Sequence, residues 1–407
     1  MTHLTQFGQE KHYKAIFCLV IVLVFMDTML YGSIVPLIPV YTHMFHLTSL
    51  SMGAIFAAYA LGLLLFSIPL GIVAERYGFK RVFIVGMGCL ALCCGLFAFI
   101  NSPIMLFWGR LMQGISGAAT WTAGLSIVAR MYPEQQGQKV GILMAAVGMG
   151  TISGPPIGGV LYELLGFHFM FIALSVICIA LFIAVCRVHF GSLDVRRNEK
   201  YVKIDIRRVL SNSRLMWFSL IFTVICCSFG MLEVIMPNYM DTRFGMDSLK
   251  IGLFFGIMGI CHACSDMLFG TLSDRYGFVP FIFWGMLGTA LVVPFLALVP
   301  TVVLLGFIMF LFGITVGAAV TPGQPYMYQI VAEDPVLSET AGAGFAYGLM
   351  NTCFSLGMML GPVIGGAVNK YFGFLPCLYG YAALIVIFAV IFYFKIMRFP
   401  VQKLQSD

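Results

Sequence analysis

The sequence predicts an all-α membrane protein with twelve transmembrane helices in two six-helix repeats, and three observations support this fold class. The chain has 407 residues, of which 60% are hydrophobic and 10% are charged, whereas soluble domains carry about 25% charged residues. The apolar residues form blocks of about twenty or more, which is long enough for a helix to cross a bilayer. Two sequence blocks also recur in the second half of the chain in the same order.

The spans follow when the chain is divided at clusters of charged residues, proline and glycine. They are 14–42, 49–75, 81–101, 103–131, 138–165, 167–190, 213–240, 248–274, 278–299, 301–331, 339–369 and 374–397. The polar and basic segment 191–212 is too long for a simple turn. It therefore predicts a cytoplasmic linker between an N-terminal bundle (1–190) and a C-terminal bundle (213–407).

Loop charges predict the orientation, because cytoplasmic loops of membrane proteins are rich in Lys and Arg. With both termini in the cytoplasm, all but four of the 23 basic residues lie on the inner side; the exceptions are Arg110, Arg243, Lys250 and Lys370. The net charge of +6 is thus assigned to topology and to contact with anionic lipids, not to nucleic-acid binding. The N-terminus lacks a cleavage pattern for a signal peptide, so the first span is expected to remain.

Cysteine is common but does not indicate a metal site. The twelve cysteines lie mostly inside apolar spans, where cysteine behaves as a small apolar residue. No spacing of ligands points to a metal, and no nucleotide-binding loop is present. We therefore expect no cofactor and no enzymatic activity.

The internal repeat consists of two blocks. GIVAERYGF (71–79) returns as GTLSDRYGF (270–278), at an offset of 199 residues, and GTISGPPIGGVLYELLGF (150–167) returns as GMMLGPVIGGAVNKYFGF (357–374), at an offset of 207. Equivalent halves of a membrane transporter place the substrate site between them, near the bilayer midplane.

Both blocks have a structural interpretation. In the first, the glycines would let helices approach and the charges could form ion pairs that latch one conformation, or could simply set the topology; its residues are Gly71, Glu75, Arg76, Gly78 and Arg81. In the second, Gly154 and Gly158 lie on one helix face and favour close packing, and Pro155 with its neighbour Pro156 adds a local kink.

Three acidic residues lie well inside predicted spans, where a charge costs roughly 2.5–3.5 kcal/mol and is usually functional. Asp27 is about 13 residues into its helix, hence roughly 20 Å from the inner end. Tyr31 follows at i+4 on the same face. A carboxylate beside an aromatic ring suits an organic ammonium ion, because the ring adds a cation–π attraction. A structural Asp27, hydrogen-bonded to a neighbouring helix, is the alternative.

Glu233 occupies the corresponding span of the second half. Pro237 and Tyr239 follow it, and Pro39 and Tyr41 stand 198 residues earlier. The two halves could therefore present Asp27 and Glu233 to one cavity, although a structural role for Glu233 remains open.

The third acid is Asp266, with His262 one turn before it. An Asp–His pair at this spacing can share a proton, and a role in helix pairing fits equally well. Arg110 lies in a span near Gln113, where it is expected to meet a carboxylate or backbone carbonyls.

The motifs together resemble the major facilitator superfamily. GIVAERYGFKR is similar to its loop motif between the second and third helices, RLMQGISGAAT (110–120) to its fourth-helix motif, and SGPPIGG to the motif of its antiporters. MDTMLYGSIVPLIP, YELLG and EVIMPNYM (233–240) resemble the vesicular amine transporters of the drug:proton antiporter group.

The resemblance implies roles for several residues. It implies that Asp27 contacts the substrate and takes part in proton coupling, that Glu233 binds the substrate, and that Arg110 has a structural or proton-linked role. It further implies a twelve-helix fold that works by alternating access. Aromatic walls of the site would come from Tyr31, Tyr239, Phe255 and Tyr347, with Asn351 as a further substrate-binding candidate.

The sequence also departs from the amine transporters. Tyr59, Val320 and Asn351 stand where those proteins carry a Lys and two Asp residues, so the proton route must differ, and Asp266 is a further departure. The short loop THMFHLTSL (42–50) and the lack of an N-x-S/T sequon favour a bacterial plasma-membrane protein.

The sequence thus predicts a monomeric proton-coupled exporter of organic cations, such as monoamines or lipophilic drugs. Its candidate proton-coupling residues are Asp27, Glu233, Asp266, His262 and Arg110. The alternatives are a proton symporter for a neutral or anionic solute and a sensor that binds a ligand without transporting it.

Overall fold

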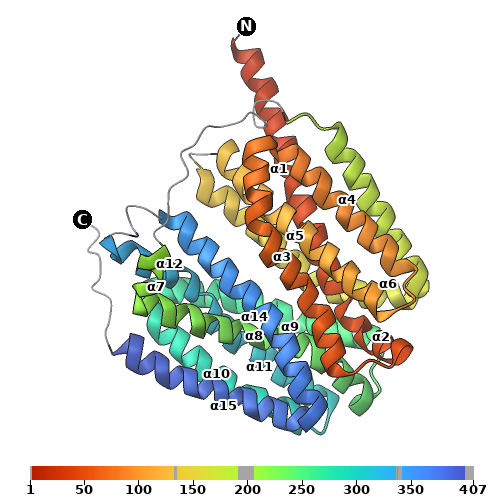
Figure 1. Cartoon of the computed structure of the whole chain (residues 1–407), viewed down its shortest axis with the longest axis vertical. Coiled ribbons are helices and arrows are strands. Elements are labelled where there is room, and N and C mark those ends of the chain that lie inside the picture. The colour runs from red at the N-terminus through yellow and green to blue at the C-terminus, as the bar shows by residue number, and fades with distance from the viewer. Residues whose placement is uncertain (1, 133–134, 191–205, 336, 338–341, 399–407) are drawn as a thin grey trace. The chain divides into compact units, whose positions relative to one another are not determined.

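A computed structural model describes residues 2–132, 135–190, 206–335, 337 and 342–398; the side chains of 2–11, 75, 137, 206, 342–344 and 347 fall outside this description. These residues form helices and no strand (Figure 1). The N-terminal helices are α1 (Thr2–Ser33), η1 (Val35–Leu37), α2 (Ile38–Phe45), α3 (Ser49–Tyr77), α4 (Phe79–Ala98), α5 (Pro103–Met131) and α6 (Gln136–Arg187). The C-terminal ones are α7 (Ile206–Ser211), α8 (Ser213–Phe244), α9 (Ser248–Tyr276), α10 (Phe278–Leu298), α11 (Val302–Val320), α12 (Gly323–Glu333), α14 (Gly342–Phe372), α15 (Phe374–Phe392) and η4 (Tyr393–Met397).

The prediction of twelve transmembrane helices is confirmed. Within the described part of the chain, ten segments are long and apolar enough to cross a membrane. One of them, Gln138–Arg187, has 50 residues and is divided at Gly166, whose φ of 74° and ψ of 174° are not helical. The 29-residue helix α5 supplies the remaining span.

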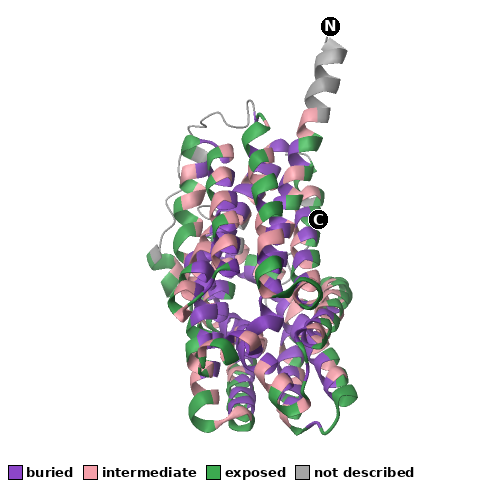
Figure 2. Cartoon of the chain, turned by 90° about the vertical axis from the view of Figure 1, so that its right-hand side faces the viewer, coloured by how far each residue is buried: buried purple, intermediate pink, exposed green. Residues whose placement is uncertain are grey.

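Lipid-facing surface is evident from large apolar side chains that are exposed in the middle of helices. Ile68 is 72% exposed, Met267 78% and Leu291 68%. Buried residues lie on the sides of the helices that face neighbouring helices (Figure 2). This distribution is that of a multi-pass membrane protein, in which lipid replaces water around the outer helix faces.

The chain forms two compact units. One comprises Met1–Glu199 with Met236–Gly256, and the other Lys200–Ile235 with Ile257–Asp407. Helices α8 and α9 each contribute residues to both units. The predicted linker 191–212 lies largely outside the described residues, so the predicted domain boundaries stay a prediction.

Glycine determines how α6 packs on α1 in the first unit. A Cβ atom added to Gly154 would lie 2.6 Å from the carbonyl oxygen of Met29, and one added to Gly158 would lie 2.2 Å from that of Ser33. Both backbones therefore approach more closely than any side chain allows. Helical dihedral angles continue through Pro155, since Gly166 is the residue of α6 with non-helical values.

The other face of α6 receives the first turns of α9. A Cβ atom on Gly252 would lie 2.3 Å from the carbonyl oxygen of Pro155, and one on Gly256 would lie 2.4 Å from Cγ of Pro156. The segment SGPPIGG thus packs against α1 through Gly154, Gly158 and Pro155, and against α9 through Pro155, Pro156 and Gly159.

The entry into α9 is fixed by Asp247. Its carboxylate accepts hydrogen bonds from the backbone N–H and from Nζ of Lys250, both at 2.8 Å. The side-chain hydrogen bond from Lys250 holds the pKa of Asp247 below its usual value. A capping acid at this position stabilises the helix N-terminus.

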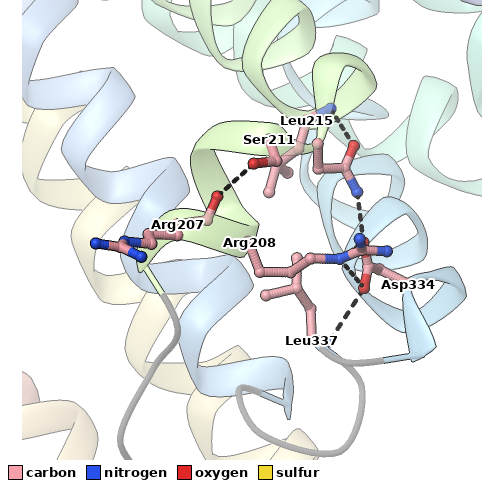
Figure 3. A network of polar contacts seen from close by, with 7 residues as sticks. Arg207, Arg208, Ser211, Leu215, Asp334 and Leu337 are labelled. Carbon is pink, nitrogen blue, oxygen red and sulfur yellow. Dashed lines mark hydrogen bonds and ion pairs between the residues drawn. The ribbon is translucent and has the colours of Figure 1, made fainter.

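In the second unit, α7 is held against the end of α12 by a polar network (Figure 3). Arg208 Nε donates to both oxygens of Asp334, at 3.1 and 3.0 Å, and Asn212 Nδ2 donates to one of them at 3.0 Å. The backbone N–H of Leu337 donates to Asp334 at 3.3 Å. The Asp334 side chain is only 4% exposed, so this carboxylate is buried with its partners in place.

The glycine packing of α6 predicts that Gly158→Ala destabilises the protein. The added methyl group would overlap the backbone of Ser33, and overpacking of this kind costs about 1–3 kcal/mol. We expect a lower melting temperature for the detergent-solubilised protein. Gly148→Ala on the same helix is the matched control, because no atom lies within 4 Å of its Cβ position. Equal melting temperatures for both variants would contradict the packing.

Candidate functional site

Asp27 lies in α1, less than two turns before the helix ends at Ser33. Its side chain is fully buried, and within the described residues neither carboxylate oxygen has a hydrogen-bond partner. The Ser116 hydroxyl on α5 lies close by but also lacks a hydrogen bond of normal geometry. An ionised carboxylate without a partner is very costly in the protein interior, so Asp27 requires either a proton or a cation.

Helices α3 and α5 enclose this carboxylate, and Gly117 makes room for it. A Cβ atom on Gly117 would lie 3.1 Å from Asp27 Oδ2 and 3.0 Å from the hydroxyl oxygen of Tyr59. Glycine at this position therefore lets the carboxylate and the hydroxyl share one small region of the interior. The backbones of α3 and α5 are also in close contact, since a Cβ on Gly114 would lie 2.0 Å from the carbonyl oxygen of Tyr59.

Two tyrosine rings lie near Asp27. The centroids of Tyr31 and Tyr59 are 4.4 Å apart, and Tyr31, one turn after Asp27, is partly exposed while Tyr59 is buried. A carboxylate with tyrosine rings beside it has the components of an ammonium-binding site.

Arg110 is a fully buried cation in the same unit. Its Nη1 donates to Gln113 Oε1 at 3.0 Å and to the carbonyl oxygen of Tyr31 at 3.4 Å. The guanidinium carbon lies 4.0 Å from the centroid of the Phe56 ring and 5.1 Å from that of Tyr31. Arg110 thus ties α5 to the α1 turn that carries Tyr31 through the Tyr31 carbonyl, while Gln113 holds the guanidinium from α5 itself.

Asp27 and Glu233 belong to different units, so their sharing of a cavity stays a prediction. Glu233 is partly buried on α8, one turn after Phe229. Tyr239 contacts Phe244 on the same helix, with ring centroids 6.0 Å apart, and Phe255 is buried.

Two further predicted substrate-binding residues lie on α14. Asn351 is partly buried, and the side chain of Tyr347 lies outside the described residues. Their role at a substrate site stays a prediction.

His262 and Asp266 do meet, as their spacing predicts: Nδ1 of His262 lies 3.0 Å from Oδ2 of Asp266. The other carboxylate oxygen accepts a hydrogen bond from the Thr321 hydroxyl. Sequence reasoning missed Thr321, although its position before Pro322 in an apolar span marked a helix break. It also missed Ser116 and Gly117, whose importance depends on contacts between helices.

In the loop motif GIVAERYGFKR of the first half, the structure differs from the sequence prediction at Gly71. A Cβ on Gly71 would meet no atom within 4 Å, so no close helix approach requires glycine there. Gly78 joins α3 to α4 with a φ of 102°, which favours glycine. Arg76 and Arg81 are exposed and have no ion pair within the described side chains. Since Glu75 has no described side chain, the ion-pair latch stays a prediction.

Metal ligands are not clustered in the part of the chain that the structure describes: no group of three or more His, Cys, Asp or Glu side chains there could hold a metal ion.

The long apolar helices and the lipid-facing surface define a multi-pass helical membrane protein. The model of the Major Facilitator Superfamily matches residues 17–338 and 218–406. The chain therefore belongs to this family, and the predicted resemblance to it is confirmed.

Individual relatives support the same conclusion. The chain is 27% identical over 362 residues to the MFS-type transporter SLC18B1 of Rattus norvegicus, which covers 85% of this chain and 78% of that protein. It is 25% identical over 396 residues to the probable vesicular acetylcholine transporter-B of Danio rerio, covering 93% of this chain and 79% of that one.

Solved structures share the fold. The nucleoside transporter NupG has a TM-score of 0.78 at 15% identity, covering 94% of this chain and 99% of that one. A bacterial homologue of the human lysosomal transporter Spinster, in an inward-facing and occupied conformation, has a TM-score of 0.79 at 15% identity, covering 95% and 97%.

The contacts of Arg110 predict that Arg110→Lys destabilises the protein even though the charge is kept. An ammonium group cannot reproduce the planar contact with Phe56 together with hydrogen bonds to Tyr31 and Gln113, and each lost hydrogen bond of a charged group is worth about 1.5–3 kcal/mol. We expect a clear fall in melting temperature. Arg81→Lys, at an exposed position, should leave it unchanged; an equally stable Arg110→Lys protein would show that the guanidinium geometry is unimportant.

Proposed function

We propose that this protein is a proton-coupled antiporter that exports organic cations by alternating access. The observation that carries the proposal is the fully buried Asp27 carboxylate, which has no hydrogen-bond partner among the described residues. A cation or a proton would satisfy the same group, and two ligands that compete for one site are the requirement for exchange.

Cation binding would use charge and aromatic surface together. Asp27 would neutralise the ammonium group, and the Tyr31 ring, partly exposed and one turn away, would add a cation–π attraction of about 0.5–2 kcal/mol. Glu233, Tyr239, Phe255, Tyr347 and Asn351 are proposed as further contacts of the substrate. Asp27 is enclosed in the present conformation, so the helices around it must separate for a cation to enter.

Proton binding would then release the cation. A proton on Asp27 removes the negative charge that holds the ammonium ion, and loss of that proton restores the site. The direction follows from the gradient: protons moving inward would drive cations outward. Glu233, Asp266, His262 and Arg110 are proposed as further members of the proton route.

The cellular setting is part of the proposal. Both termini would face the cytoplasm of a bacterial plasma membrane, the protein would work as a monomer, and the basic inner loops would contact anionic lipids. The similarity to a probable vesicular acetylcholine transporter, whose named substrate is an organic cation, supports transport of an organic cation over a neutral or anionic solute.

Two alternatives are separated by simple measurements in proteoliposomes. A symporter would accumulate its solute in the direction in which protons flow, whereas an antiporter accumulates it against that direction. A ligand sensor with the same fold would bind ethidium saturably but show no counterflow.

The first experiment tests Asp27 by ethidium or labelled serotonin transport under an imposed pH gradient. Asp27→Asn should abolish both gradient-driven uptake and exchange, because an amide can neither carry the charge nor release a proton, while the melting temperature stays close to that of the wild type. Glu163→Gln is the matched control, since Glu163 is an exposed acid on α6. Exchange at the wild-type rate in Asp27→Asn would refute the role of this residue.

The second experiment compares cationic with neutral substrates. If Glu233 binds the ammonium group, Glu233→Gln should weaken transport of ethidium more than transport of an uncharged substrate of similar size, because only the cation loses an electrostatic partner. The measurement is the ratio of initial uptake rates. Equal losses for both substrates would point to a structural role of Glu233 in α8.

A further inference from the structure

Two glycines of α11, Gly313 and Gly317, let α9 and α11 approach each other closely in the second unit. Gly313, Gly317 and Thr321 follow at intervals of four, so they share one face of the span. A Cβ on Gly313 would lie 2.7 Å from the carbonyl oxygen of Met258, and one on Gly317 would lie 2.6 Å from Ser265 Oγ and 3.2 Å from Asp266 Oδ1. The absence of a side chain at Gly317 allows Asp266 to reach this face.

Asp266 uses this close approach to bridge two helices. Its Oδ2 faces Nδ1 of His262 at 3.0 Å, and its Oδ1 accepts a hydrogen bond from the Thr321 hydroxyl. Nε2 of His262 is buried and without a hydrogen-bond partner among the described atoms. The imidazole ring also contacts Phe229 on α8, with a centroid distance of 5.0 Å.

Thr321 stands at the break in this span. Helix α11 ends at Val320 and α12 begins at Gly323. The backbone N–H of Thr321 still donates to the carbonyl of Gly317 at 3.0 Å, but Pro322 has no N–H to continue the helix. Thr321 and Pro322 both keep helical dihedral angles, so the interruption lies in the hydrogen bonding, and the hydroxyl bonded to Asp266 belongs to the residue just before it.

The electrostatic surroundings of the pair are sparse. Helix α11 carries no titratable side chain. On α8, Glu233 is the acid nearest in sequence to Phe229, one turn away on the same face. On the adjoining described turns of α8 and α9 the remaining titratable groups are thiols: Cys226 and Cys227 on α8, Cys261 and Cys264 on α9. The first turns of α12 carry Tyr326.

We propose that Asp266 and His262 are a proton-binding pair of the second unit, and that Thr321 transmits its protonation state to the break between α11 and α12. This inference rests on the proposed proton-coupled function. With Asp266 ionised, the carboxylate accepts from both His262 Nδ1–H and the Thr321 hydroxyl.

Protonation reverses one of these hydrogen bonds. A proton added to Oδ1 of Asp266 makes that oxygen a donor to Thr321 Oγ1, and the Thr321 hydroxyl then turns to the Gly317 carbonyl of its own helix. Threonine hydroxyls that bond to the carbonyl four residues earlier bend the helix. One proton on Asp266 thus changes the geometry of the span at Pro322.

The test compares coupling with exchange in the reconstituted full-length chain. The readout is the ratio of pH-gradient-driven ethidium accumulation to ethidium exchange without a gradient. Asp266→Asn, which imitates the protonated acid, and Thr321→Val, which keeps the shape but lacks the hydroxyl, should both lower this ratio at least about tenfold, in the usual range of site-to-site coupling. Thr321→Ser, which keeps the hydroxyl, should stay within about twofold of the wild type. A Thr321→Val ratio equal to that of the wild type, or a parallel fall of accumulation and exchange, would overturn the proposal.

A second readout does not need a substrate. In infrared titration of the detergent-solubilised protein, the carbonyl band of a protonated carboxyl group should appear on acidification, be lost in Asp266→Asn and shift in Thr321→Val but not in Thr321→Ser. An unshifted band in Thr321→Val overturns the inference. If the band behaves as expected while the wild type transports no ethidium, the proposed function fails and the proton-binding pair stands.

Discussion

The central constraint on this molecule is the free energy needed to keep a carboxylate in an apolar interior. Asp27 is fully enclosed, and neither of its oxygens has a hydrogen-bond partner in the described part of the chain. Asp334 shows the alternative arrangement in the same protein, since it is nearly buried but bonded to Arg208, Asn212 and Leu337. A buried carboxylate with a purely structural role has its hydrogen bonds made by neighbouring side chains and backbone groups, as Asp334 does. The difference between the two supports the proposal that Asp27 binds a ligand reversibly.

In both units, glycine allows polar side chains from different helices to meet. Gly117 leaves space beside Asp27 and Tyr59, and Gly317 lets Asp266 reach α11. Without a hydrophobic force between helices in lipid, such close packing is also what holds the helices together. Glycine therefore has two roles in this sequence. In α6 it stabilises the packing of helices, and beside Asp27 and Asp266 it allows polar side chains from different helices to meet.

Much of the fold could be predicted from the sequence, because apolar blocks of membrane length and the basic loops specify spans directly. The break at Gly166 coincides with a predicted span boundary. Within the site, the contact between His262 and Asp266 followed from a spacing of four on one helix. Thr321, Ser116 and Gly117 could not be found this way, because helix-to-helix contacts depend on how each helix is rotated. Ion pairs proposed for the loop motif likewise depend on side-chain positions that spacing does not determine.

If both units bind protons, the two acids would have different roles. Asp27 would exchange a cation for a proton, and Asp266 would link a second protonation to the geometry of the span at Thr321.

The most direct test of the central claim is the number of protons released when ethidium binds to the purified protein in weakly buffered solution. Competition at one carboxylate predicts proton release in the wild type that is absent in Asp27→Asn. Saturable binding with no proton release anywhere in the physiological pH range would contradict it.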